Sequence, residues 1–169
     1  IFIYLKKIIN KKKYGNVKSY SIKWNFISHD YNRKKKTWKV QDHFGGGITN
    51  IFLTHVLSYC EYLFGKNILY ETYIKKDNFK RIKYINHIDT KIKNNNGVSG
   101  RIVLKTKKRG NQRHEIQVKF DKCLIIIKNK SKDWSKNFQI KVNGKKMSIK
   151  NNSKYSDGRS DQIEYLIKK

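Results

Sequence analysis

"GGGITNIFLTHVLSYCEYLFG", residues 45–65, is the stretch that most strongly constrains the fold. Its apolar side chains recur at the spacing of one helix face, at Ile48, Phe52, Val56, Tyr59 and Leu63. A run of three glycines precedes this pattern, and Gly65 follows it. The spacing predicts an amphipathic helix over residues 48–64, opened by a glycine turn that lets the helix begin close to another element.

The sequence before this helix predicts a helix, a strand and a loop. Residues 1–13 repeat apolar side chains with a helical period, and Gly15 follows as a usual helix stop. Residues 16–26 alternate between apolar and polar, with one break in phase, which is typical of a strand. Residues 29–43 are polar, basic and aperiodic, so we expect a long loop there.

The sequence after the helix predicts consecutive strands joined by tight turns. "NNNG" at 94–97 separates two alternating runs, and Asn143-Gly144 lies between "FQIKV" and "KKMSI", a strong hairpin pattern. The C-terminal "SDGRSDQIEYLIKK" predicts a loop and then a helix that starts near Ser160. The expected strands cover residues 68–74, 86–93, 98–105, 115–120 and 122–128.

Strands that are linked by hairpins run antiparallel, and helices that precede and follow them pack as a separate layer. We therefore predict an α+β fold, an open and predominantly antiparallel sheet with helices packed on one face. The 169 residues suffice for a single domain over 1–169. Because the chain begins with Ile1 rather than Met, we expect a domain truncated at both ends.

The composition is strongly basic, with 40 Lys and Arg against 12 Asp and Glu, a net charge of +28. Such a charge, taken alone, favours nucleic acid or an anionic surface as partner. However, the chain lacks proline and alanine and is rich in Lys, Asn, Ile and Tyr, a bias that A/T-rich codons produce without selection. The basic residues are also dispersed, so nucleic acid is disfavoured and kept as an alternative.

Cys60 and Cys123 lie in apolar runs without a C-x-x-C spacing, which predicts buried free thiols in a reducing compartment. No apolar stretch is long enough to span a membrane. We therefore expect a cytoplasmic protein without a membrane partner. The histidines share no spacing typical of a metal site, so no metal is predicted.

Two features of the central stretch allow a chemical role beside a structural one. Gly45, Gly46 and Gly47 could bring backbone amides close to a phosphate, but no P-loop or dinucleotide pattern is present, which favours a packing turn. His55 could act as a general acid or base, although a lone histidine near an apolar helix face is more often structural. Trp38 could stack on a sugar or a base, or belong to the core.

Several segments together resemble the C-terminal domain of the Gfo/Idh/MocA oxidoreductases. "LKKIINKKKYGNVKSYSIKW" resembles the opening helix and strand of that domain, and "IDTKIKNNNGVSGRIVLK" resembles its hairpin. "SDGRSDQIEYL" is similar to the segment before the last helix. Between them, the loop, glycine run and catalytic helix of the family are matched by Trp38, Asp42, Gly45–Gly47, His55 and Leu63–Gly65.

The resemblance implies the substrate-binding and oligomerisation domain of an enzyme whose Rossmann half binds NAD or NADP and is absent from this chain. Hydride would pass to or from a hydroxyl carbon of a sugar, cyclitol or related substrate. His55 would be catalytic, and the open sheet would form a homo-dimer or homo-tetramer. The implied substrate-binding residues are Trp38, Asp42, Gly45, Gly46, Gly47, Asn50 and Thr54.

One position departs from the family pattern. Many members carry an Asp four residues before the helix His, and that position is Ile51 here. An isoleucine side chain cannot accept a proton. A catalytically inactive assembly protein that keeps the sheet interface therefore stays open as an alternative.

Overall fold

The structure, a computed structural model, describes residues 1–27, 30, 33, 35–79, 81–107, 112–129 and 138–147. The first half contains α1 (Phe2–Asn10), β1 (Val17–Ile27), the 3-10 turns η1 (Trp38–Val40) and η2 (Asp42–Phe44), the π-helical segment η3 (Ile48–Leu53) and α3 (Thr54–Phe64). The strands that follow are β2 (Asn67–Phe79), β3 (Ile82–Asn94), β4 (Ser99–Lys107), β5 (Arg113–Phe120), β6 (Leu124–Asn129), β7 (Gln139–Val142) and β8 (Lys145–Met147).

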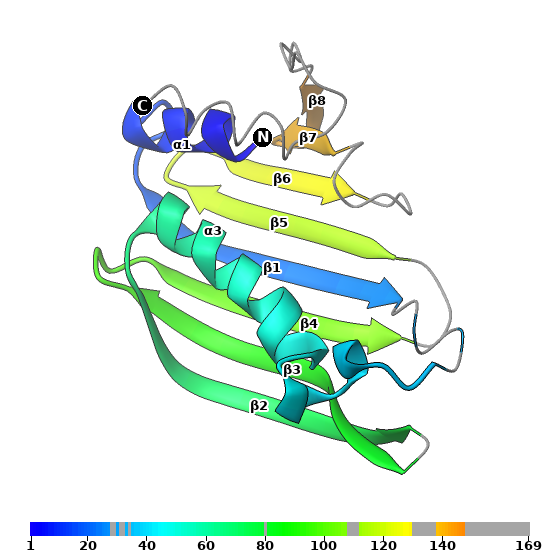
Figure 1. Ribbon diagram of the computed structural model, residues 1–169. Helices are drawn as coiled ribbons and strands as arrows, with labels where there is room; N and C mark the ends of the chain where they lie inside the picture. The colour runs from blue at the N-terminus through cyan, green and yellow to red at the C-terminus, as the bar shows by residue number, and fades with distance from the viewer. Residues whose placement is uncertain are drawn as a thin grey trace, which may run out of the picture.

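Eight strands of the described chain form one open sheet in the order β2-β3-β4-β1-β5-β6-β7-β8. Strand β1 lies in the interior of the sheet, parallel to β4 and antiparallel to β5, although it precedes both by a long stretch of sequence (Figure 1). The other neighbouring pairs are antiparallel. The predicted α+β class with a predominantly antiparallel sheet is confirmed.

The alternation in β1 fixes which face of the sheet is covered. Tyr20, Ile22, Trp24 and Phe26 are buried, whereas Lys23 between them is exposed. The break in phase at the start of the strand coincides with a register shift between Val17 and Ser19 in the β1–β5 pairing. The apolar face of β1 is the face on which the helices pack.

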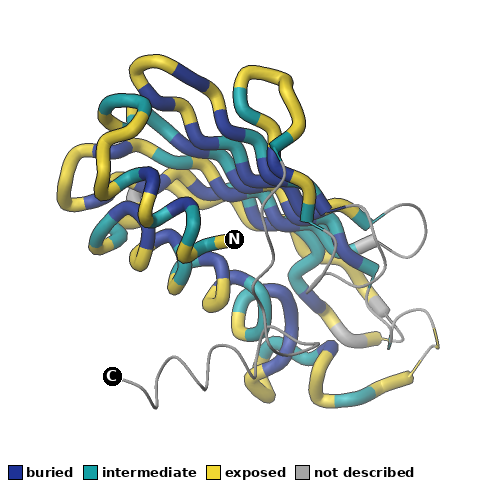
Figure 2. Tube along the Cα trace, turned by 90° about the horizontal axis from the view of Figure 1, so that it is seen from above, coloured by how far each residue is buried: buried dark blue, intermediate teal, exposed yellow. Residues whose placement is uncertain are grey.

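Helices α1 and α3 lie together on one face of the sheet, as Figure 1 shows. The Phe64 ring of α3 stacks on Tyr20 with centroids 4.1 Å apart. Phe52 of η3 stacks on Phe26 at a centroid distance of 3.8 Å. In Figure 2, the buried segments gather between the helices and the sheet, in the interior of the molecule. The predicted packing of helices on one face is confirmed.

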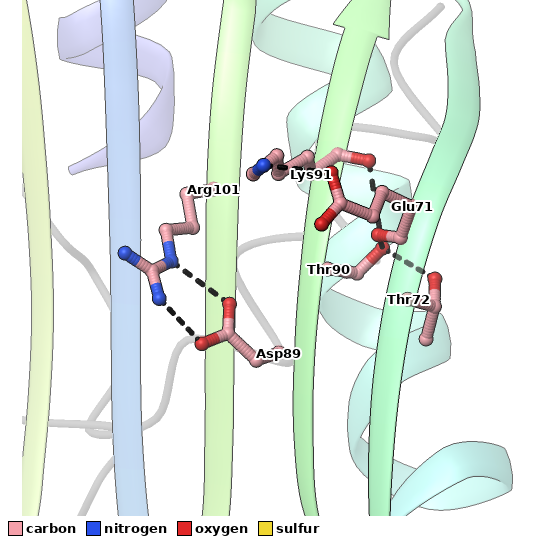
Figure 3. A network of polar contacts seen from close by, with 6 residues as sticks. All are labelled: Glu71, Thr72, Asp89, Thr90, Lys91 and Arg101. Atoms are coloured by element: carbon pink, nitrogen blue, oxygen red, sulfur yellow. Dashed lines mark hydrogen bonds and ion pairs between the residues drawn. The ribbon is translucent and has the colours of Figure 1, made fainter.

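The opposite face of the sheet carries polar networks. Figure 3 shows Asp89 of β3 accepting two hydrogen bonds from Arg101 of β4, at 2.8 and 2.6 Å, with the helix behind the strands. Lys91 pairs with Glu71 at 2.6 Å in the same view. We call this the uncovered face. The polar residues of this face alternate along each strand with the buried apolar residues of the other face. The strand sequences therefore show an apolar–polar alternation rather than a continuous apolar run.

The predicted turns are confirmed, but two strands are longer than predicted. Gly97 has φ +84°, and Asn143 and Gly144 have φ of +47° and +81°, as the two hairpins require. Strand β2 continues to Phe79, beyond the predicted end at residue 74. Strand β3 already begins at Ile82, before the predicted start at residue 86. The added residues 75–78 of β2 are polar and exposed, as an edge strand tolerates, whereas Tyr84 in the added part of β3 is buried against Val40. The predicted helix near Ser160 lies outside the described residues.

Two segments of the central region also differ from expectation. The predicted loop at 29–43 contains η1 and η2. The predicted helix 48–64 begins with the π turn η3, in which Ile48 and Leu53 are both buried although they lie five residues apart. Such spacing departs from the α-helical period, and π turns are often found at functional sites.

Both cysteines are buried and free, which confirms the predicted buried thiols. No helix within the described ranges has the length and apolar character needed to cross a membrane.

Candidate active site

The glycine run lies where the loop after β1 meets the start of η3. The Gly45 amide donates to the carbonyl oxygen of Asp42 at 3.2 Å, and the Gly46 amide donates to that of Gln41 at 3.1 Å. A Cβ at Gly46 would overlap the carbonyl oxygen of Trp38. Close backbone packing therefore explains the glycines, and the amides of Gly45 and Gly46 are engaged within the turn rather than free to hold a phosphate.

Asp42 holds this turn against the sheet. Its Oδ2 accepts a hydrogen bond from the backbone amide of Ile85 on β3 at 2.9 Å. Its Oδ1 is buried and lies against Gly47, at a place that a Cβ on Gly47 would occupy. Gly47 also has φ +77°, which disfavours any side chain. Burial raises the pKa of the Asp42 carboxyl, while the Ile85 amide, Lys76 and His43 oppose this rise.

Asn50 joins the turn to the first turns of the helix. Its Nδ2 donates to the carbonyl oxygens of Asp42, at 3.1 Å, and of Gly46, at 2.9 Å. The Thr54 hydroxyl donates to the carbonyl oxygen of Asn50 at 2.7 Å. Asn50 and Thr54 remain exposed. Their hydrogen bonds fix the backbone of the segment that presents His55.

His55 is exposed at the start of α3, directly after Thr54. No hydrogen bond joins its side chain to another residue of the described ranges. Ile51, four residues earlier, is half-buried. The alternative of a buried structural position for this histidine is therefore wrong, and the imidazole is exposed at the surface.

Two aromatic side chains flank the glycine turn. Trp38 is 54% exposed and Phe44 is 62% exposed. The alternative of a core position for Trp38 is thereby wrong. Phe44 was not predicted as a site residue. Its position next to Gly45 was the available indication, but an aromatic beside a glycine run is also common in ordinary turns.

The predicted site residues lie along one stretch of chain that runs from η1 through the glycine turn and η3 to the start of α3, and we call this stretch the glycine-turn surface. It consists of Trp38, Asp42, Phe44, Gly45–Gly47, Asn50, Thr54 and His55. The region is open rather than enclosed: the cavity beneath it, lined by Gly47, Ile48 and Phe52 among others, measures about 20 Å³. A larger hollow of about 540 Å³ lies elsewhere, around Ser19 and Phe120. Within the described ranges, no three His, Cys, Asp or Glu side chains are placed to hold a metal ion.

A family described as the oxidoreductase family, C-terminal alpha/beta domain, matches residues 6–165. The chain belongs to the Gfo/Idh/MocA oxidoreductase family. No curated protein matches the sequence.

Solved structures share the fold of this Gfo/Idh/MocA domain at low sequence identity. Aldose–aldose oxidoreductase from Caulobacter crescentus, complexed with glycerol, is 16% identical with a TM-score of 0.73, over 99% of this chain and 49% of that one. An oxidoreductase from Thermotoga maritima is 16% identical with a TM-score of 0.66, over 98% and 46%. Levoglucosan dehydrogenase in complex with NADH and levoglucosan is 15% identical with a TM-score of 0.63, over 91% and 41%. The chain therefore spans less than half the length of each of these proteins.

The core of the Gfo/Idh/MocA domain also contains a histidine. His114 of β5 stacks on Trp24 with centroids 4.5 Å apart. Its burial lowers the pKa of the imidazole to about 4, so the ring is neutral near pH 7. His114 therefore belongs to the core, whereas the side chain of His55 is exposed.

Proposed function

We propose that this chain is the substrate-side domain of an NAD- or NADP-dependent oxidoreductase that acts on a hydroxyl carbon of a sugar, cyclitol or related substrate. The family membership supports the reaction class. The observation that carries the proposal is the exposed imidazole of His55 at the start of α3, which forms no hydrogen bond within the described part of the chain, together with an exposed Trp38 at the start of the same loop-to-helix segment. An exposed indole offers a flat apolar face for a sugar ring.

In this proposal, each side chain of the glycine-turn surface has a separate role. The imidazole of His55 takes the proton from the substrate hydroxyl as hydride leaves the same carbon, and it returns the proton in the reverse reaction. Asn50 and Thr54 orient neighbouring hydroxyls, and Trp38 packs against the ring. The glycine turn lets the substrate approach the helix start closely. Because Ile51 cannot relay a proton, His55 acts without a carboxylate four residues before it.

The nucleotide is bound mainly outside this domain. A nicotinamide supplies hydride transfer when it is bound, but its pyrophosphate needs free backbone amides or cations in a cradle. The amides of Gly45 and Gly46 already donate within the turn. The residues of the turn do not fit the pyrophosphate, so a separate Rossmann domain would hold it. NADH and levoglucosan in the complex of levoglucosan dehydrogenase support this choice of cofactor and substrate class.

We also propose that copies assemble as a dimer or tetramer through the uncovered face. Val103 and Ile126 are half-buried there, and Tyr73 is 60% exposed. Val103→Asp should convert the assembly to monomers in sedimentation analysis. Ile3→Asp, an exposed apolar position on α1, should leave the mass unchanged. A wild-type monomer would contradict this assembly.

The buried free thiols of Cys60 and Cys123 support a reducing, cytoplasmic compartment.

The central experiment measures nicotinamide-dependent turnover of aldoses and levoglucosan by the intact protein. His55→Ala should lower kcat by a factor of about 100 or more, as expected for loss of a general acid–base group. Ser58→Ala, exposed on the same helix, should leave turnover unchanged. Equal turnover of His55→Ala and wild type would remove His55 from the mechanism.

Two other outcomes identify the alternatives. NAD(P)H binding without turnover, together with assembly through the uncovered face, would favour an inactive assembly homologue with Ile51 as its cause. Strong binding to nucleic acid that falls steeply with salt, without nicotinamide binding, would favour the nucleic-acid alternative. The coding sequence before Ile1 offers an independent check, because a Rossmann unit with a G-x-G-x-x-G turn should be found there.

A further inference from the structure

Asp42 contacts three separate parts of the fold at once. Its carboxylate accepts the Ile85 amide of β3 at 2.9 Å, across 43 residues of sequence. Its carbonyl oxygen accepts from the Gly45 amide at 3.2 Å and from Asn50 Nδ2 at 3.1 Å. Loop, strand and η3 therefore meet at one residue, and two of its three oxygens are engaged.

The third oxygen, Oδ1, is buried against Gly47 rather than directed to solvent. An oxygen in that place is poorly available to a sugar hydroxyl approaching the exposed surface. Gly47 carries no side chain, and this is what allows the carboxylate to lie flat against the backbone. The packing favours a structural link over substrate contact for Asp42.

The link continues to the exposed side chains of the site. Asn50, which donates to the Asp42 carbonyl, also donates to the Gly46 carbonyl at 2.9 Å. The carbonyl oxygen of Asn50 accepts the Thr54 hydroxyl at 2.7 Å, and His55 follows directly. A displacement of Asp42 would thus be transmitted through Asn50 to the first turn of α3.

We propose that Asp42 is a positioning residue, which joins η3 to β3 and thereby sets the place of His55, Asn50 and Thr54 over the substrate. Its consequence for turnover rests on the proposed function, whereas the link itself does not. The interaction needs an acceptor facing Ile85, and an asparagine side chain can supply one. Asp42→Asn is therefore the variant that should retain the link, and Asp42→Ala is the variant that should lose it.

Amide hydrogen exchange on the intact protein tests the link without any ligand. Asp42→Ala should speed exchange of the Ile85 amide about tenfold or more, as expected for loss of a hydrogen bond to a charged acceptor. Asp42→Asn should stay within about threefold of wild type, since an amide oxygen still accepts. Asp121→Ala is the matched control, because the Asp121 carboxylate accepts the backbone amide of Asn16 at 2.7 Å, away from this site. It should free the Asn16 amide and leave Ile85 unchanged.

Positioning is tested by NMR and by kinetics. The backbone amide signals of Thr54 and His55 should shift in Asp42→Ala and stay in place in Asp42→Asn and Asp121→Ala, at equal Tm. In turnover, Asp42→Ala should lower kcat about tenfold or more with a smaller change in KM, and Asp42→Asn should restore it. Unchanged Ile85 exchange in Asp42→Ala would overturn the link. Lost protection with unchanged kcat and NMR signals would overturn the positioning role while the proposed function stands. A wild-type protein without nicotinamide-dependent turnover would contradict the proposed function alone. Amide exchange and NMR would still test whether Asp42 links η3 to β3.

Discussion

Tyr59 of α3 and His114 of β5 meet across the helix–sheet interface, with the phenol Oη 3.2 Å from Nε2 of the imidazole. The neutral ring can accept the phenol proton at Nε2, provided that Nδ1 carries the hydrogen, and a protonated ring cannot. Burial lowers the pKa of His114 to about 4 from the usual histidine value of 6.5. The contact between helix and sheet is therefore coupled to pH.

The sign of this coupling follows from the lowered pKa. The unfolded chain binds a proton at His114 more readily than the folded chain, so stability from this group is full above pH 6.5 and falls toward pH 4. We expect about 2 kcal/mol less unfolding free energy at pH 5 than at pH 7.5. Urea unfolding at the two pH values measures it. The His114→Gln variant should lose less unfolding free energy than wild type when the pH falls from 7.5 to 5. Equal losses in the two proteins would contradict the assignment of this pH dependence to His114.

Glu115 should contribute stability from the uncovered face. Its side chain is 2% exposed, accepts from Gln117 at 2.7 Å and pairs with Lys128 at 2.9 Å and with Arg113. Burial alone would raise its pKa, but hydrogen bonds from Arg113, Lys128 and Gln117 outweigh it and lower the pKa to about 2. This stability is present above about pH 4.5 and is lost as pH falls through about 2.

Glu115→Gln should therefore cost about 1–2 kcal/mol of unfolding free energy at pH 7, because both cations are partly exposed and water screens them. Chemical denaturation measures the change. Glu71→Gln is the matched control, since Glu71 pairs with Lys91 at the surface and is 62% exposed. It should cost no more than about 0.5 kcal/mol. Equal costs would show that burial of Glu115 does not strengthen its ion pairs.

Gly47 and Asp42 should be energetically coupled. Gly47→Ala introduces strain at φ +77° and an overlap with Asp42 Oδ1. Removal of the carboxylate relieves the overlap but not the strain. In a double-mutant cycle, Gly47→Ala should therefore cost about 1 kcal/mol less in the Asp42→Ala background than in wild type. Additive costs within experimental error would place the carboxylate away from Gly47.

Asn94, the last residue of β3, lies next to the C-terminal end of α3. Its substitution should lower stability more than that of any other polar residue in this region. Its Nδ2 donates to the Gly65 carbonyl at 2.7 Å and to Asn67 Oδ1 at 2.9 Å, while its Oδ1 accepts the Tyr20 hydroxyl at 3.0 Å. Asn94→Ala leaves these partners unsatisfied in the interior, at an expected cost of about 2–3 kcal/mol. Asn96→Ala, exposed in the same turn, should change stability by less than about 0.5 kcal/mol. Thermal unfolding of the two variants compares them directly.

Local patterns predicted most elements of the fold, because their causes are local. The alternation at Tyr20–Phe26 and the turn at Asn143–Gly144 each depend on residues within a few positions, and both are confirmed. The parallel pairing of β1 with β4 was not predicted, since nothing within either strand encodes its neighbour. The π turn was also missed, because it depends on how Ile48 and Leu53 both reach the core.

The candidate site residues were brought together by the resemblance to the Gfo/Idh/MocA family, and not by any spacing pattern in the sequence. Composition alone could not relate Trp38 to His55, because 17 residues and several turns separate them. The contact between Asp42 and Ile85 spans 43 residues and involves a backbone amide, which leaves no trace in side-chain sequence. The exposure of His55 was not predicted either, because its position next to the apolar side chains of the helix was compatible with both a buried and an exposed ring.

The interior place of β1 also has a consequence for how the chain folds. β2, β3 and β4 form one meander, and β5 to β8 form another, each from neighbouring segments. Within the described sheet, β1 is the strand that joins the two, because Ile22 pairs with Ile102 of β4 and with Ile116 of β5. Closing such long loops carries an entropic cost, so we expect both meanders to form early and insertion of β1 to limit the folding rate. Until then each meander has an open edge, and the partly folded chain is most prone to aggregation at that stage.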